Sequence, residues 1–267
     1  MSTDHATGAR SLRGFLISDL RRDGALELMR SLSACFDMHV QPAIWVSAGE
    51  LEDSEVVNID RFRARHLRNP LPSEIGIALA HRSIYEQMVH NAIAWAVVFE
   101  DDARVLDIDA LTDRLDLLVQ HLPRAHPCLV NMNHKAATRL LPLRRPLIDG
   151  TWRPIVPTYT ATAYLLNLKA AEKLLSEQSP VQAQADWPVD CRQVLFLQES
   201  QAIVEPRPDV ASVADPDGTR AQVPRGVRFK TWSWLWYFRH RRSFGGPRDY
   251  WHGVLLPRLM RHLYRSV

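Results

Sequence analysis

The sequence has no long apolar run and few cysteines, and each absence argues against a class of protein. No stretch approaches the ~18 apolar residues that a membrane-spanning helix needs, and the first ten residues lack the apolar core of a secretion signal. The three cysteines are an odd number, widely spaced and without a CxxC pair, which argues against both a disulfide framework and a zinc site. We therefore expect a soluble protein of the reducing cytoplasm.

Three common motifs are also missing. The sequence has no GxGxxG, no GxxxxGK[ST] and no GxSxG, which removes the commonest dinucleotide-binding, P-loop and hydrolase interpretations. With 267 residues, of which 46% are hydrophobic and 24% charged, the chain can bury one substantial core or two modest ones.

The net charge of +3 conceals two regions of opposite sign. Residues 225–267 contain ten Lys or Arg and one acid, a local charge of +9 that leaves −6 for the rest, and they also hold four of the eight tryptophans. A basic, Trp-rich segment suits an anionic membrane surface, where Trp lies at the headgroup level. Packing of this segment onto the body is an equal alternative. Nucleic acid ranks well below both, because no recognised nucleic-acid motif accompanies the charge.

The most informative stretch is WAVVFEDDARVL, at positions 95–106. An apolar run short enough for a buried strand ends at three adjacent carboxylates, Glu100, Asp101 and Asp102. Adjacent acids repel one another unless a cation or solvent compensates. Ligands of open α/β sheets lie beyond the carboxyl ends of strands, and all-oxygen ligation favours Mg²⁺ or Mn²⁺ shared with substrate phosphates. The alternative is a solvated acidic turn.

Strand and helix patterns alternate along the chain. A strand, a helix and a second strand near the start imply a parallel pair whose ends, near Asp19 and residues 47–49, open on the same edge as the triplet if all three strands run parallel. We place a nucleotide at that edge. The expected strands are 14–18, 43–46, 94–99, 128–132, 159–166 and 202–204, and the expected helices are 23–34, 73–90, 108–122 and 168–177, with Ser73 and Asn167 among the N-caps.

Two further polar residues each allow a structural and a functional interpretation. His81 lies on an apolar stripe of the helix at 73–90, where a hydrogen-bonded core histidine is more frequent than a ligand or catalyst. Asp190, in the DWPVD segment at 186–190, either caps a helix or turn beginning at Cys191 or brings a second carboxylate to the triplet.

Six blocks follow one another along the chain: LISDLRR (16–22), DRFRA (60–64), LPSEIGIALAHRSIYEQM (71–88), VVFEDDARVL (97–106), TATAYLLNLKAAEKLL (160–175) and WPVD (187–190). In this order they resemble glycosyltransferase family 25, which contains bacterial lipopolysaccharide and lipooligosaccharide galactosyltransferases and the collagen galactosyltransferases. The resemblance spans roughly residues 14–210.

The resemblance implies an α/β, GT-A-like nucleotide-diphospho-sugar transferase fold, with a mostly parallel central sheet flanked by helices. A flexible start at 1–13 precedes this domain, and a linker and basic C-terminal segment at 211–267 follow it. The implied reaction is an inverting, Mn²⁺- or Mg²⁺-dependent transfer of a sugar, most familiarly galactose, from a UDP-sugar to a glycan or lipid-linked oligosaccharide. Such a reaction would serve lipopolysaccharide or other cell-surface glycan synthesis at the inner face of a bacterial membrane.

The resemblance also implies roles for individual residues. The helix motif of the family commonly ends in Leu-Ser-His, and here Ala80 replaces the Ser while His81 is retained.

Two alternative functions remain open, that of a non-catalytic nucleotide- or glycan-binding relative and that of a metal-dependent phosphoryl or nucleotidyl transferase. The residue roles below are those that the family resemblance implies. The implied metal ligands are Asp102, Glu100 and Asp190, the donor-binding residues are Ser18, Arg22, Gly49, His81, Glu100 and Asp101, and the catalytic base is Asp190, with Asp186 in reserve.

Overall fold

A seven-stranded mixed sheet is the centre of the part of the chain that the computed structural model describes, residues 12–21, 23–66, 69–133, 148, 150–152, 161–185 and 193–207. The strand order is β2-β1-β3-β7-β5-β8-β6. Five strands point the same way, and two run against them, so the predicted α/β fold with a mostly parallel sheet is confirmed and is compatible with a GT-A-like architecture. The five are β1 (Arg13–Ile17), β2 (Asp37–Gln41), β3 (Trp95–Glu100), β5 (Cys128–Asn131) and β8 (Leu195–Glu199), and the two are β6 (Thr151–Trp152) and β7 (Ala163–Asn167).

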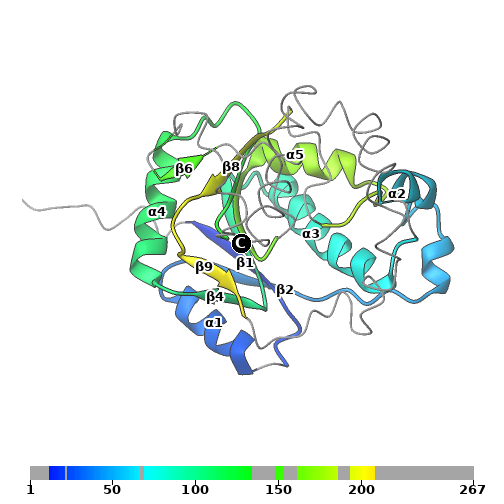
Figure 1. Ribbon diagram of the computed structural model, residues 1–267, viewed down its shortest axis with the longest axis horizontal. Helices are drawn as coiled ribbons and strands as arrows, with labels where there is room; N and C mark the ends of the chain where they lie inside the picture. Colours follow the sequence, from blue (N-terminus) through cyan, green and yellow to red (C-terminus); the bar gives the residue numbers. More distant parts are fainter. Residues whose placement is uncertain are drawn as a thin grey trace, which may run out of the picture.

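Helices cover both faces of this sheet (Figure 1). On one face, α1 (Asp23–Ser33) and α4 (Ile108–His121) bury leucines against Val97, Phe99 and Val130. On the other, α3 (Pro72–His90) and α5 (Leu168–Glu177) pack on Val98 and Leu166. Alternate residues of β3 thus enter opposite cores, as strand geometry requires, and the strand that ends in the acidic triplet is buried on both faces.

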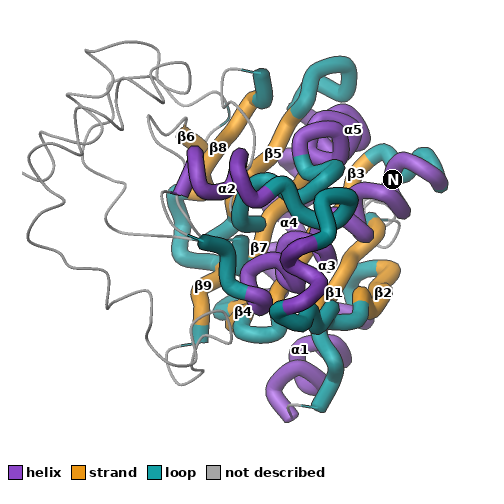
Figure 2. The backbone as a smooth tube through the Cα atoms, turned by 90° about the vertical axis from the view of Figure 1, so that its right-hand side faces the viewer, coloured by secondary structure: helices purple, strands orange, loops and turns teal. Residues whose placement is uncertain are grey.

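A two-stranded ribbon and two short helices complete the described fold (Figure 2). The short strands β4 (Ala103–Val105) and β9 (Val204–Pro206) pair into a two-stranded ribbon. Helix α2 (Ile59–His66) buries Phe62 in a satellite core with Ile75 and Val181. The 3-10 helix η2 (Gly49–Glu52) precedes it. No helix in the described ranges is long and apolar enough to cross a membrane.

The second strand lies earlier than predicted. The apolar segment 43–46 is irregular, and the strand is Asp37–Gln41, whose side chains are mostly exposed or half-buried. Among the described strands β2 pairs with β1 alone and so lies at the edge of the sheet, where a strand need not be apolar. Pro42 follows it and cannot donate to a ladder. The segment packs instead on α3, where a Cβ on Gly76 would lie 2.1 Å from the Ile44 carbonyl oxygen, so only glycine permits this approach.

Other differences lie at element boundaries and in the last third. Helix α3 begins at Pro72 with Leu71 in the N-cap position, so Ser73 is not the cap; the Glu74 carboxylate accepts from the Leu71 amide. The strand predicted at 159–166 is Ala163–Asn167, and the one predicted at 202–204 is Val204–Pro206. Strands β8 (Leu195–Glu199) and β6 (Thr151–Trp152) are not among the predicted strands, and the two-residue β6 gives no signal in the sequence.

Asn167 is the predicted cap of α5 and does more than cap it. Its Oδ1 accepts from the amides of Ala170 and Cys128, while its Nδ2 donates to the carbonyls of Pro123 and His126. The fully buried amide therefore joins the start of α5 to the segment that leads into β5.

Replacing Asn167 by Ala should cost more free energy of unfolding than losing an ordinary cap. The cap alone accounts for about 1 kcal/mol, and each buried backbone group left without a partner adds about 1–3 kcal/mol. The matched control is Asp107→Ala, because Asp107 caps α4 through a single, exposed bond to the Ala110 amide. Chemical denaturation of both variants compares them, and equal losses would contradict the bridging role.

Candidate active site

The carboxyl ends of β1 and β3 lie side by side at one edge of the sheet. Ile17 pairs with Glu100 in the parallel ladder, so the residues that follow these strands are neighbours. The end of β7 that precedes Ala163 meets the same edge, because the Glu100 amide donates to the Thr162 carbonyl at 2.9 Å. The predicted meeting of the first strand and the acidic triplet at one edge is confirmed.

A tight turn after β1 forms one wall of this edge. The Ser18 amide donates to the Gln41 carbonyl of β2, and its hydroxyl accepts from the Leu20 amide at 2.9 Å. The Asp19 carboxylate accepts from the Arg21 amide. These bonds hold Leu20 at φ +58°, a left-handed conformation that is uncommon outside glycine and that concentrates at functional sites. Ser18 is 2% exposed, so in this structure it orders the turn.

Asp101 and Asp102 form the turn between β3 and β4. The Asp102 carbonyl accepts from the Arg207 amide at 2.7 Å, directly after β9. Across the ribbon, Arg104 of β4 donates to the Glu205 carboxylate of β9. The turn that carries the two aspartates is therefore held in place by its contact with β9. Both aspartate residues are half-buried.

Glu100 is held differently from its two neighbours. Its Oε1 lies 3.1 Å from Nε2 of His81, and Nδ1 of His81 lies 2.7 Å from the Tyr164 hydroxyl. His81 is 1% exposed, whereas the Glu100 side chain is 25% exposed. The expectation of a hydrogen-bonded core histidine is thus confirmed, and His81 reaches the site edge through Glu100.

The donor set of the triplet fits a metal ion shared with a ligand better than a preformed metal centre. In the part of the chain that the structure describes, no three His, Cys, Asp or Glu side chains converge to hold a metal ion. Mg²⁺ is characteristically bound through one or two carboxylates plus substrate phosphates, with water completing the shell. The residues of the triplet that would hold such an ion are Asp102, with Asp101 or Glu100.

Four of the predicted site residues lie away from this edge or outside the described residues. Gly49 begins η2 on the surface, well beyond the end of β2, because that strand ends at Gln41 rather than at Val46. Arg22, Asp186 and Asp190 lie outside the described residues, as does the basic segment 211–267. The helix or turn expected at Cys191 likewise lies largely outside them.

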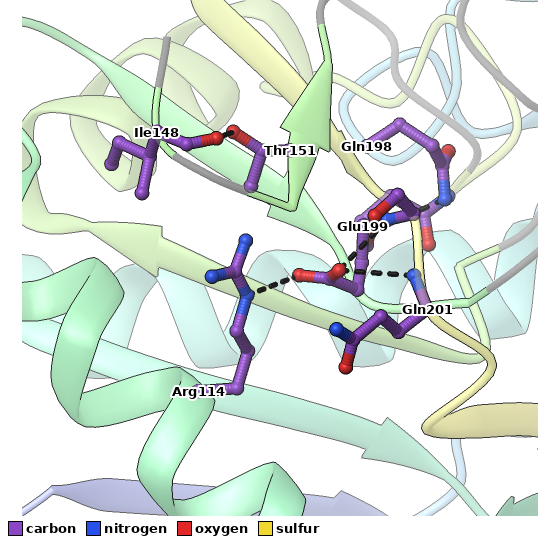
Figure 3. A network of polar contacts seen from close by, with 8 residues as sticks. Arg114, Ile148, Thr151, Gln198, Glu199 and Gln201 are labelled. Carbon is purple, nitrogen blue, oxygen red and sulfur yellow. Dashed lines mark hydrogen bonds and ion pairs between the residues drawn. The ribbon is translucent and has the colours of Figure 1, made fainter. Parts of the chain in front are cut away.

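Sequence reasoning missed two buried polar groups near the edge. Tyr164 sits within the strand-like run TATAYLL, and nothing in its alternation distinguishes it from a core aromatic. Glu199 ends β8 and is 0% exposed, with its Oε2 2.6 Å from Nε of Arg114 on α4 (Figure 3). The signal at Glu199 is weaker than the one at Glu100, because Gln198 separates this single carboxylate from the apolar run that precedes it.

A comparison with known protein families matches the centre of this site. The model described as glycosyltransferase family 25 (LPS biosynthesis protein) matches residues 43–127, which include α3, β3, the triplet and α4. The chain carries a glycosyltransferase family 25 region. The resemblance seen in the sequence is thereby confirmed, and the GT-A-like sheet is consistent with it.

Curated relatives belong to the same family. The chain is 27% identical over 177 residues to the bovine "probable inactive glycosyltransferase 25 family member 3", covering 61% of this chain and 28% of that protein. The rat protein of that name is 34% identical over 115 residues, or 39% and 18% of the two chains, and the human "inactive glycosyltransferase 25 family member 3" is 27% identical over 177 residues, or 61% and 28%. The chain thus spans less than a third of the length of these relatives.

Proposed function

We propose that this protein is a glycosyltransferase that moves a sugar, with galactose as the first candidate, from a UDP-sugar to a glycan hydroxyl with inversion. The observation that carries the proposal is the acidic triplet, which follows a doubly buried strand within the family 25 region and lies beside the ordered turn of Ser18. This edge is where open α/β sheets bind ligands. The carboxylates cannot bind a diphosphate directly because both are anionic, so a divalent cation between them fits the charges.

The proposed roles follow from the family resemblance and from the chemistry of the transfer. A bound Mn²⁺ or Mg²⁺ would supply Lewis-acid neutralisation of the diphosphate leaving group. Asp102 would hold this ion, with Asp101 or Glu100 assisting at the metal or the ribose. Inversion also needs a base for the acceptor hydroxyl, and Asp190 is the proposed base, with a metal ligand as its alternative role and Asp186 in reserve.

The proposed acceptor is a glycan or lipid-linked oligosaccharide of cell-surface glycan synthesis. The basic, Trp-rich residues 225–267 support a lipid-linked acceptor at the inner face of a bacterial membrane, because they combine a charge of +9 with four tryptophans. On this proposal the protein is cytoplasmic and peripheral to that membrane.

The deciding experiment is a calorimetric titration of the whole chain with UDP and a panel of UDP-sugars, with and without Mn²⁺. The proposal expects UDP binding that depends on the metal, and the tightest sugar identifies the donor. Product analysis then distinguishes transfer, which releases UDP, from phosphoryl or nucleotidyl transfer, which moves phosphate or releases pyrophosphate. No UDP binding by folded protein would reject the proposal.

A second candidate is a non-catalytic nucleotide- or glycan-binding protein. It is favoured by the names of the curated relatives, which describe those proteins as inactive or probably inactive. Metal-dependent UDP binding without turnover on any acceptor or on water would support this candidate instead.

A further inference from the structure

A chain of buried hydrogen bonds leads from the core to the acidic triplet. The hydroxyls of Tyr85 and Tyr164 lie 3.1 Å apart, the Tyr164 hydroxyl lies 2.7 Å from Nδ1 of His81, and Nε2 of His81 lies 3.1 Å from Oε1 of Glu100. The first three side chains are at most 2% exposed. They come from α3 and β7, whereas Glu100 ends β3, so the chain links three elements at the carboxyl edge of the sheet.

The protons in this chain can be placed by what each group is able to donate. An ionised Glu100 carboxylate only accepts, so Nε2 of His81 carries a proton. In a neutral ring Nδ1 must then accept, and its donor is the Tyr164 hydroxyl. Burial, followed by the neighbouring Tyr85, raises the pKa of Tyr164 well above the ordinary tyrosine value, so this hydroxyl keeps the proton that it donates. Tyr164 in turn can accept from Tyr85.

The same contacts limit how the His81 ring can move. Its plane lies against the Tyr164 ring, with the centroids 5.6 Å apart and the planes at 25°. A ring bonded at both nitrogens and packed in the core has one orientation, so the Nε2 proton points at one place, the Glu100 carboxylate.

We propose that His81 is a positioning residue, oriented by Tyr164, that holds Oε1 of Glu100 and leaves Oε2 as the oxygen that serves the donor site. His81 itself is enclosed and contacts the donor only through Glu100, which differs from the direct donor-binding role that the sequence resemblance implied. This inference rests on the proposed function for the identity of the ligand, a UDP-sugar with a divalent cation. Partners that orient a metal-binding side chain typically change affinity by about 10–100-fold when they are removed.

Two conservative variants separate positioning from stability. Tyr164→Phe removes the hydroxyl that orients His81, whereas Tyr85→Phe removes an equally buried hydroxyl and leaves the Tyr164–His81 bond in place. Tyr164→Phe should lose more free energy of unfolding than Tyr85→Phe, because it breaks the bonds to both Tyr85 and His81, whereas Tyr85→Phe breaks only the bond between the two tyrosines. Only Tyr164→Phe should weaken Mn²⁺-dependent UDP binding, by about tenfold or more. Equal UDP affinity in Tyr164→Phe and wild type, with both folded, would overturn the inference.

Two variants of His81 test whether a hydrogen-bond donor at this position restores UDP binding. His81→Leu removes both bonds and should weaken UDP binding at least as much as Tyr164→Phe. His81→Gln can place an amide N–H near the position of Nε2 and should recover part of the affinity. If His81→Leu fails to fold, the comparison of the two tyrosine variants still decides.

A donor-independent measurement distinguishes failure of this inference from failure of the proposed function. Long-range ¹H–¹⁵N spectra of the whole protein should show His81 protonated at Nε2, with Nδ1 as an acceptor, and Tyr164→Phe should shift the Nδ1 signal while Tyr85→Phe leaves the tautomer unchanged. A ring protonated at Nδ1 alone would overturn the inference whatever the protein binds. Wild type that shows the expected tautomer but binds no UDP would reject the proposed function and retain the hydrogen-bonded chain.

Discussion

Asp102→Asn should abolish the Mn²⁺-dependent part of UDP binding while leaving the fold intact. The amide has nearly the shape of the carboxylate but no charge, and the backbone bond from the Arg207 amide to the residue 102 carbonyl does not depend on the side chain. Since such ions are held by only one or two protein carboxylates, losing one should weaken binding by about 100-fold or more, which is about 2.7 kcal/mol. Calorimetry with and without Mn²⁺ measures the loss.

The matched control is Asp107→Asn. This acid lies five positions further along the chain, is exposed, and caps α4, a role that Asn fills equally well. The same chemical change there should leave UDP binding and stability unchanged. If both variants bind UDP as wild type does, with the metal dependence preserved, Asp102 is not the metal ligand.

Asp190→Asn tests the proposed catalytic base, which acts on the acceptor rather than on the donor. A catalytic base acts on the acceptor hydroxyl, so its loss should lower turnover and preserve donor binding. Loss of metal-dependent binding in Asp190→Asn would assign this residue to the metal instead. The two outcomes separate the alternatives that the sequence left open.

The site edge could be predicted because its signals are local. A strand buried on both faces is continuously apolar, so the abrupt change to three acids marks both its end and the exposed edge. Asn167 was recognised as a cap from its place before a helical pattern, and the structure confirms that bond. Neither inference needs to know which strands are neighbours.

What could not be predicted depends on contacts that are distant in the chain. The sequence places His81 on an apolar face but cannot show that its two nitrogens meet Tyr164, 83 positions away, and Glu100, 19 positions away. Strand β2 was misplaced because an edge strand with one neighbour need not be apolar, whereas the nearby segment that is apolar packs on α3. In each case the tertiary environment decides the role of the residue.

The buried pair of Arg114 and Glu199 should be the most costly to break of the described ion pairs. The Arg114 side chain is 10% exposed and Glu199 is fully buried, so water cannot solvate either charge if the pair is broken in the folded protein. Oε1 of Glu199 also accepts from the amides of Ser200 and Gln201 (Figure 3). Gly150, at φ +75°, lies against the same guanidinium, since a Cβ there would be 2.9 Å from Nη2 of Arg114.

Glu199→Ala should therefore lower the free energy of unfolding by about 3–5 kcal/mol, because it leaves a buried guanidinium without its counter-charge. Denaturant titration measures this loss. The control is Glu172→Ala, which breaks an exposed pair with Lys169 on α5 and should cost about 0–1 kcal/mol. Equal losses in the two variants would contradict the buried pair.

A double variant shows whether the loss of free energy of unfolding comes from the unpaired Arg114 charge. In Arg114→Met/Glu199→Gln both charges are gone, and the Gln carbonyl can still accept from the amides of Ser200 and Gln201. The double variant should be much more stable than the summed losses of the single variants Arg114→Met and Glu199→Gln predict, since replacing a buried pair by neutral groups is often nearly neutral. Because the turn at 200–201 leads into β9, which supports the Asp102 turn through the Arg207 amide, a double variant that keeps its stability should bind UDP as wild type does.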